Sequence, residues 1–241
     1  MSRDKAVRKP ITTSGPTADP GEGNPVIHRA ASLAEEVYEA IFAQLMALKI
    51  PPGARITVDG LVREFNVSQT PIREALGRLE GEGLVVKTHL VGYSAAPQIS
   101  RRRFTELYQL RLLLEPDAAR RAASAMTDVA LQDLADAAGL MSRVEGSDER
   151  ARYSRFARED AVFHDRILAV AGNGLIRETL AHQHIHFHIF RLMFHSRVTE
   201  EALDEHAAIL AAFSRRSPDE AERAMRTHIE RSRDRLLPAF D

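Results

Sequence analysis

The chain has 241 residues, of which 33 are Lys or Arg and 34 are Asp or Glu, so its formal net charge is −1. This length suits one large domain or two small ones, and near-neutrality excludes a polybasic coat for nucleic acid while allowing a local basic patch. The absence of cysteine excludes disulfides, thiolate zinc sites and cysteine nucleophiles. No apolar run approaches the roughly 20 residues that span a bilayer, and the N-terminus lacks a signal peptide's apolar stretch, so we expect a cytoplasmic protein.

Residues 1–31 are expected to form a disordered tail, because Pro and Gly recur there without a sustained apolar period. Ser32 is expected to cap the first helix, which Pro51 and Pro52 would end. The apolar stripe of this helix consists of Leu33, Val37, Ile41, Leu45 and Leu48.

Residues 32–97 are predicted to form one unit with the order helix, helix, turn, helix, hairpin. Two short helices are expected at about 58–65 and from Ser68 to about Gly81, with Asn66 and Val67 between them. Strands are expected at 84–88 and 92–95, around a turn. This arrangement is typical of proteins that insert one helix into the major groove of DNA and place a wing over the neighbouring backbone.

The third helix of this unit has a buried and an exposed face. Its expected buried stripe is Ile72, Ala75, Leu76 and Leu79. Near its N-terminus Gln69, Thr70 and Arg73 would point outward, where a recognition helix meets DNA. Gln69 can pair with adenine, Arg73 with guanine or phosphate, and Thr70 with phosphate.

The residues of this unit resemble the winged helix-turn-helix of the GntR family of bacterial transcription regulators. The resemblance rests on residues 61–76 (LVREFNVSQTPIREAL), 79–85 (LEGEGLV) and Gly92-Tyr93. It implies double-stranded operator DNA as a partner and contacts from Arg63, Ser68, Gln69, Thr70, Arg73, His89 and Gly92. Asp59 and Gln69 depart from the family pattern, since both stand where relatives usually have arginine, so the operator sequence cannot be copied from them.

Residues 98–241 are predicted to be all-helical, because Ile99 to Phe240 contain only four Gly and three Pro and no convincing strand. Breaks in the pattern divide the segment into about six helices. The predicted fold is therefore mainly α, with an N-terminal winged helix-turn-helix and a C-terminal all-α bundle.

Four ionisable residues occupy predicted core stripes of this bundle. Asp160 and His164 are four residues apart on one helix face, and His206 and His228 lie on the apolar stripes of two other helices. One divalent cation would satisfy all four groups together, since a buried charge needs a partner. The spacing alone leaves open the alternative of separately hydrogen-bonded core histidines.

The second half resembles the FCD ligand-binding domain of the FadR-type branch of the same family. The matching segments are 107–115 (LYQLRLLLE), 160–164 (DAVFH), 171–173 (AGN), 205–210 (EHAAIL) and 225–228 (MRTH). The resemblance implies a divalent metal held by Asp160, His164, His206 and His228, with zinc, nickel and manganese all open. About six helices, instead of seven, favours the VanR-like subgroup.

The same resemblance implies a small organic acid as effector, which binds at the metal. Arg111 matches a family arginine that faces the cavity, with a surface or intersubunit salt bridge as the alternative. Asn173 either reaches the pocket or only forms a helix-ending turn. The four histidines between His182 and His188 are expected to lie on different faces of one helix, with at most one at the pocket.

We therefore predict a homodimeric regulator, most simply a repressor of a metabolic operon with a palindromic operator. It is not expected to be an enzyme, and no catalytic residue is assigned. One alternative is a metal-dependent hydrolase, although no additional pocket carboxylate stands out as a general base. The other is a helical dimerisation module without an effector.

Overall fold

The computed structural model describes residues 33–142, 149–192 and 196–241. The expected tail at 1–31 and the expected cap Ser32 lie outside these ranges. Within them, no helix combines the length and the apolarity that a membrane span requires.

The first helix, α1, spans Leu33–Met46. Val37, Ile41 and Leu45 are buried as the stripe predicts, but Leu33 is half exposed at the start of the helix. The predicted stripe also includes Leu48, but this residue lies beyond the end of the helix and has a left-handed backbone (φ 54°). The chain turns there, before Pro51 is reached.

The helix-turn-helix consists of α2 (Val58–Phe65) and α3 (Gln69–Gly81). The Thr57 hydroxyl accepts a hydrogen bond from Gly60 N and caps α2. Asn66 ends α2 with φ 54° and ψ 45°, a left-handed conformation that Asn tolerates better than most residues. Ile72, Ala75, Leu76 and Leu79 are fully buried, which confirms the predicted stripe of α3.

The wing is a three-stranded antiparallel sheet with the order β1-β3-β2, formed by β1 (Arg55–Ile56), β2 (Val85–Thr88) and β3 (Gly92–Ala95). The hairpin β2–β3 was predicted. Strand β1 was not, because two residues after a Pro-Gly turn carry no readable alternation. It pairs with β3 through Arg55 opposite Ser94 and Ile56 opposite Tyr93.

The C-terminal bundle has seven α-helices among the described residues, followed by a 3₁₀ turn at Leu237–Phe240. The helices are α4 (Arg101–Ala125), α5 (Asp128–Met141), α6 (Glu149–Val170), α7 (Gly174–Ala181), α8 (Ile185–Phe190), α9 (Ser196–Ser214) and α10 (Pro218–Leu236). The mainly α fold with a winged helix-turn-helix and an all-α bundle is thereby confirmed.

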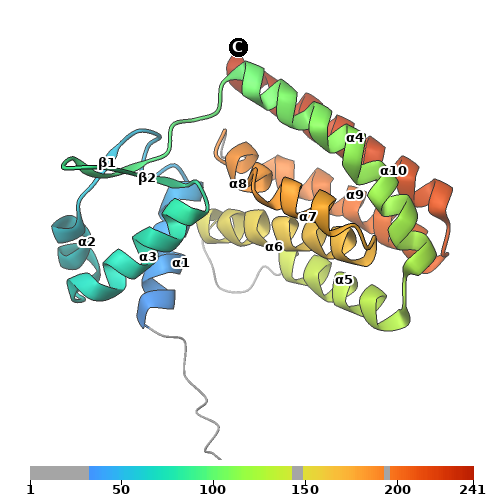
Figure 1. The fold of residues 1–241 in the computed structure, drawn as a ribbon, viewed down its shortest axis with the longest axis horizontal. Helices are drawn as coiled ribbons and strands as arrows, with labels where there is room; N and C mark the ends of the chain where they lie inside the picture. Colours follow the sequence, from blue (N-terminus) through green and yellow to red (C-terminus); the bar gives the residue numbers. More distant parts are fainter. Residues whose placement is uncertain (1–32, 143–148, 193–195) are drawn as a thin grey trace, which may run out of the picture. The chain divides into compact units, whose positions relative to one another are not determined.

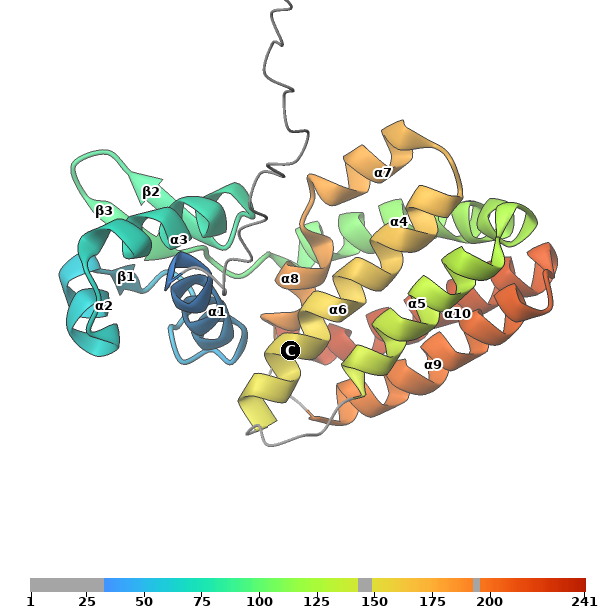
Figure 2. The ribbon, with the colours of Figure 1, turned by 90° about the horizontal axis from the view of Figure 1, so that it is seen from below.

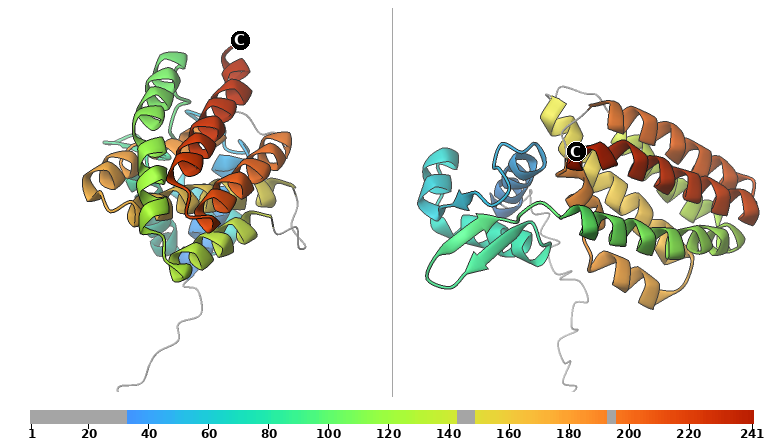
Figure 3. Two further views of the ribbon diagram at one scale, coloured as in Figure 1. Left: turned by 90° about the vertical axis from the view of Figure 1, so that its right-hand side faces the viewer. Right: turned by 90° about the horizontal axis from the view of Figure 1, so that it is seen from above.

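Helix α6 is the central helix of the bundle, since it packs against α4, α5, α7, α8 and α9. Helices α4 and α10 run alongside each other (Figures 1 and 3), and the buried hydroxyls of Tyr108 and Ser232 form a hydrogen bond of 2.8 Å between them. Figure 2 shows α6 passing between α7 and α5. A side chain on the inner face of α6 is therefore surrounded by helices.

The bundle has one helix more than the predicted number of about six, because the segment that contains the four histidines is broken. Helix α7 ends at Ala181, and His184 takes a left-handed conformation (φ 45°) before α8 begins. His182 and His186 are therefore not on one helix. The helix count that favoured the VanR-like subgroup no longer supports it.

Asn66 provides a test of the turn between α2 and α3. Replacing it with Ala should lower the free energy of unfolding by about 1 kcal/mol, because an added Cβ without an amide disfavours the left-handed conformation. Asn66→Gly is the control and should change stability little. Urea unfolding of the two variants and the parent chain measures the difference, and equal losses in both variants would contradict this account of the turn.

Candidate functional site

The four predicted metal ligands meet inside the bundle. Asp160 and His164 come from α6, His206 from α9 and His228 from α10, and all four are buried. One ligand atom from each of them lies within 4.8 Å of the others. The predicted juxtaposition therefore exists among the described residues.

Two outer carboxylates set the protonation of two of these histidines. Glu115 lies 2.6 Å from Nδ1 of His164, and Glu205 lies 2.9 Å from Nδ1 of His228. A carboxylate accepts hydrogen bonds, so each Nδ1 carries the proton and each Nε2 keeps its lone pair. This is the tautomer that a metal-binding imidazole needs.

The lone pairs left on these imidazoles converge. Nε2 of His164 and Nε2 of His228 are 3.2 Å apart, yet neither is free to donate to the other. Nε2 of His206 is 3.2 Å from Asp160 Oδ1, but without hydrogen-bond geometry, so both ring nitrogens of His206 are buried without a hydrogen bond. Such buried, unsatisfied atoms fit a cation, because ligand atoms of a tetrahedral zinc ion are separated by about 3.3 Å.

Each outer carboxylate is in turn held by an arginine. Glu115 accepts from Nε of Arg111 at 2.6 Å, and Glu205 accepts from Nη1 of Arg235 at 2.5 Å. Burial would raise the pKa of Glu115, but the charge of Arg111 and the hydrogen bonds from His164 and Arg111 outweigh it and hold that pKa well below its usual range. Burial likewise opposes the lowered pKa of Glu205, which the hydrogen bonds from His228 and Arg235 produce. Both carboxylates are therefore ionised near neutral pH.

Burial keeps the inner imidazoles neutral. It lowers the pKa of His164 to about 3 and that of His228 to about 4, even though Glu115 and Glu205 act in the opposite direction. Burial would raise the pKa of Asp160, but the charge of His186 and its hydrogen bond outweigh it and hold that pKa well below its usual range. The centre thus offers one carboxylate and neutral imidazoles.

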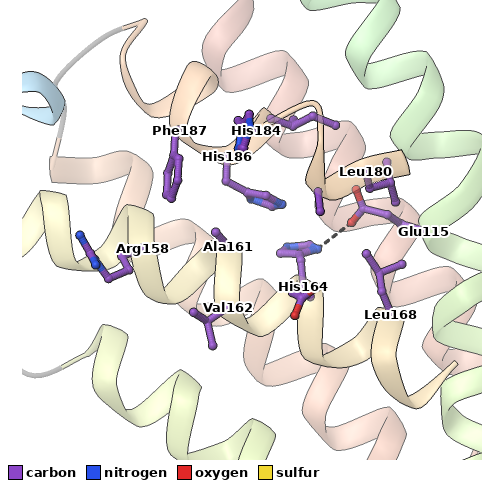
Figure 4. A pocket seen from close by; sticks show the side chains of 13 residues that line it. Glu115, Arg158, Ala161, Val162, His164, Leu168, Leu180, His184, His186 and Phe187 are labelled. Carbon is purple, nitrogen blue, oxygen red and sulfur yellow. Dashed lines mark hydrogen bonds and ion pairs between the residues drawn. The ribbon is translucent and has the colours of Figure 1, made fainter. Parts of the chain in front are cut away.

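A pocket of about 280 Å³ reaches this centre at His164. Its inner end is polar, with Glu115, His164 and His186, and Figure 4 shows the rings of His164 and His186 next to each other. Apolar side chains form most of the remaining wall, namely Ala161, Val162, Leu168, Leu180, Ile185 and Phe187. Arg158, Asp165 and His184 also line it, so the pocket suits a small ligand that has both an apolar part and polar groups.

His186 is one of the residues at this centre that the sequence reasoning missed, together with the outer carboxylates Glu115 and Glu205. Its Nδ1 is 2.6 Å from Asp160 Oδ2, so it holds the carboxylate oxygen that faces away from His206. The break at His184 turns it toward α6, and no sequence pattern announces a left-handed histidine. Glu115 could have been found, because it follows Arg111 by four residues on one helix.

The two predicted effector contacts lie elsewhere. Arg111 is only 1% exposed, its donors are directed at Glu115, and it does not line the pocket. Asn173 caps α7, with its side-chain oxygen accepting from Ile176 N at 3.2 Å, and it does not line the pocket either. Neither alternative describes these placements in full, because the ion pair of Arg111 is buried within α4 instead of lying at a surface or between subunits, and Asn173 begins α7 instead of ending a helix.

All seven predicted DNA contacts are exposed on the winged unit. Ser68 precedes α3 without forming a side-chain cap, which leaves its hydroxyl available. Gly92 has φ 104° at the start of β3, a conformation that L side chains rarely adopt. The exposed set is Arg63, Ser68, Gln69, Thr70, Arg73, His89 and Gly92.

Known families and proteins match both parts of the chain. The family model described as "Bacterial regulatory proteins, gntR family" matches residues 33–93, and the FCD domain model matches residues 106–231. The Nta operon transcriptional regulator of Aminobacter aminovorans is 30% identical over 188 residues, covering 77% of this chain and 86% of that protein. The transcriptional repressor RspR of Escherichia coli is 27% identical over 198 residues, covering 81% of this chain and 85% of that protein.

Two solved structures share the fold. E. coli McbR/YncC aligns with a TM-score of 0.63 and 18% identity, covering 88% of this chain and all of that chain. A putative GntR regulator from Rhodococcus sp. RHA1 aligns with a TM-score of 0.63 and 21% identity, covering 87% of this chain and all of that chain. Together with the family matches, these findings identify the chain as a DNA-binding transcription regulator that belongs to the GntR family and carries an FCD domain.

Proposed function

We propose that the protein is a homodimeric, metal-containing repressor of a metabolic operon whose DNA binding is controlled by a small organic acid. The observation that carries this proposal is the convergence of Asp160 with ring nitrogens of three buried histidines, beside a pocket that reaches His164. Both ring nitrogens of one of them, His206, lack a hydrogen-bond partner in good geometry. Separately hydrogen-bonded core histidines would not leave His206 without any hydrogen bond.

A divalent ion fits the donors of this centre. Asp160, His164, His206 and His228 would hold it, and three imidazoles with one carboxylate suit zinc, nickel or manganese. Glu115 and Glu205 would orient His164 and His228 from outside, as outer carboxylates commonly do for metal-bound histidines.

An organic acid fits the pocket that ends at His164. A bound metal supplies positive charge for a carboxylate, while the apolar wall accommodates the rest of a small ligand. In this proposal Arg111 acts through Glu115, by holding the carboxylate that orients His164. Asn173 acts indirectly, because its side chain caps the start of α7 and so helps to position that helix, whose Leu180 lines the pocket.

The exposed N-terminal end of α3 would read the operator. Gln69 and Arg73 would contact base edges, Ser68 and Thr70 would contact phosphate, and Arg63 would bind the backbone beside them. His89 and Gly92 would contact DNA from the wing. In this proposal two copies of the chain bind the two halves of a palindrome.

The names of the relatives favour a regulator over a hydrolase, because the Nta operon transcriptional regulator and RspR are both named as transcription regulators. A module for dimerisation alone would have no need of a pocket that reaches the buried His164.

Elemental analysis tests the metal centre. The purified chain should carry about one equivalent of divalent metal, and the double variant His164→Ala, His206→Ala should lose most of it, because two of four ligands are removed. His182→Ala removes an exposed histidine outside the centre and is the control. Circular dichroism checks that the variants fold, and unchanged metal content in the double variant would refute the assignment.

The same samples test the effector. Small organic acids should raise the Tm of the metal-loaded parent chain, because a ligand that binds only the folded state stabilises it. The double variant should lose this shift. If none of the acids shifts the Tm of the metal-loaded parent chain, the effector part of the proposal fails while the metal part stands.

The pH dependence of the metal-free chain tests the buried imidazoles. In the unfolded chain these histidines take up protons near pH 6.5, whereas in the folded chain His164 and His228 resist protonation down to about pH 3 and 4. The unfolded state therefore binds more protons below pH 6.5, and stability should fall by up to about 1.4 kcal/mol per pH unit for each of the two. Urea unfolding with a chelator at pH 7, 6 and 5 measures this, and equal stability at all three would contradict it.

Arg73→Ala tests the recognition helix. The operator duplex is first selected from random sequences with the parent chain. Loss of the base or phosphate contact of Arg73 should weaken binding to this duplex by about tenfold or more. Arg102→Ala, an exposed arginine of the bundle, is the control. Gel-shift titration measures the affinity, and operator binding like that of the parent chain would refute the role of Arg73.

A further inference from the structure

An unusual acidic residue lies beside the N-terminus of α3. Asp59 is exposed in the first turn of α2, and its Oδ1 accepts a hydrogen bond from Nε2 of Gln69 at 3.0 Å. Oε1 of Gln69 in turn accepts from Nη2 of Arg73 at 3.3 Å. Three exposed side chains from two helices thus form one hydrogen-bonded chain, which we call the polar triad (Asp59, Gln69, Arg73).

The two charged members determine the orientation of the amide between them. A carboxylate only accepts hydrogen bonds and a guanidinium only donates them, whereas a carboxamide can be rotated to present either atom. The nitrogen of Gln69 must therefore face Asp59, and its oxygen must face Arg73. Without Asp59, one of the two interactions that set this orientation disappears.

We propose that Asp59 is a specificity-determining residue of the DNA-binding surface, because it holds Gln69 in one orientation in front of Arg73. This inference rests on the proposed role of α3 in reading the operator. Glutamine recognises adenine by donating to N7 and accepting from N6, so the orientation of its amide decides which arrangement of a base pair it accepts. A fixed amide rejects the arrangements that a freely rotating one would tolerate.

The charge of Asp59 has a second effect. A carboxylate on this surface repels phosphate on every DNA sequence alike, so it weakens binding to non-operator DNA as much as to the operator. The operator recovers affinity through the oriented Gln69 and Arg73, whereas other sequences do not. Asp59 should therefore increase the ratio of specific to non-specific affinity.

Helix α2 supplies a matched control for this charge. Glu64 is also exposed on α2, but its carboxylate accepts from Gln44 at 2.6 Å and pairs with Lys49 at 3.4 Å, away from the triad. Glu64→Ala removes one negative charge from the same helix as Asp59→Ala does. A difference between the two variants therefore reports the contact with Gln69 and not the net charge.

The experiment is a selection of bound duplexes from a randomised DNA library with the full chain. The parent and the variants Asp59→Ala, Glu64→Ala, Gln69→Ala and Arg73→Ala are compared, and each is checked for folding by circular dichroism. Asp59→Ala should relax the consensus at the base pairs that Gln69→Ala also relaxes, and should lower the ratio of operator to random-duplex affinity about tenfold. Glu64→Ala should leave the consensus unchanged.

Two results would overturn the inference. The first is that Asp59→Ala leaves the consensus and the affinity ratio unchanged, although Gln69→Ala or Arg73→Ala alters them. In that case α3 reads the operator, but Asp59 does not contribute to its specificity. The other is the same relaxation in Glu64→Ala as in Asp59→Ala, which would make the effect one of charge alone. If Gln69→Ala and Arg73→Ala also leave the consensus unchanged, the proposed reading role of α3 fails and the inference fails with it.

Discussion

The C-terminal bundle depends on how it neutralises the charges that it buries at its centre. Removing an ion from water costs several kcal/mol, so each buried charge must find a partner. Arg111 with Glu115 and Arg235 with Glu205 form outer pairs, and each carboxylate also holds one imidazole of the inner group. These contacts join α4 to α6 and α9 to α10, and the two halves of this polar network meet at the Nε2 atoms of His164 and His228, 3.2 Å apart.

The inner group of Asp160, His164, His206 and His228 is the part of this network in which ring nitrogens lack hydrogen-bond donors or acceptors from the protein. The outer carboxylates fix protons on the Nδ1 atoms, and the Nε2 atoms of His164 and His228 then face each other without a proton to share. Nδ1 of His206 has no hydrogen-bond partner, and its Nε2 only approaches Asp160 Oδ1 at 3.2 Å without good hydrogen-bond geometry. A cation completes the network in the proposed function, and the pocket at His164 would give a ligand direct access to it. An acid bound there would act on α6, the helix that contacts most of the bundle.

The DNA-binding unit shows a different use of charge. The whole chain has a formal charge of −1, so its net charge supplies no general attraction to DNA. Its exposed recognition end instead has a carboxylate, an amide and a guanidinium in hydrogen-bond contact. Under the proposal, selectivity comes from the fixed order of donors and acceptors in the polar triad and from the geometry of a dimer, at the expense of affinity for random sequences.

Local patterns predicted much of this architecture, and long-range packing determined the rest. The stripe of α3, the hairpin and the pairing of Asp160 with His164 follow from periodicities of two and 3.6 residues. The short strand β1 could not be predicted, because only its partner β3 makes it a strand. The contact between Glu115 and His164 joins residues 49 positions apart, and the left-handed His184 that directs His186 to Asp160 breaks an otherwise helical pattern. Such features depend on tertiary contacts that no single segment encodes.

Anomalous X-ray scattering from crystals of the full chain, measured on both sides of the absorption edge of the bound metal, tests the central claim most directly. The account predicts one strong peak per chain, within bonding distance of Asp160, His164, His206 and His228. The absence of a peak there in crystals grown with zinc, nickel or manganese would contradict it. A peak only at the exposed histidine segment around His182 would contradict it equally.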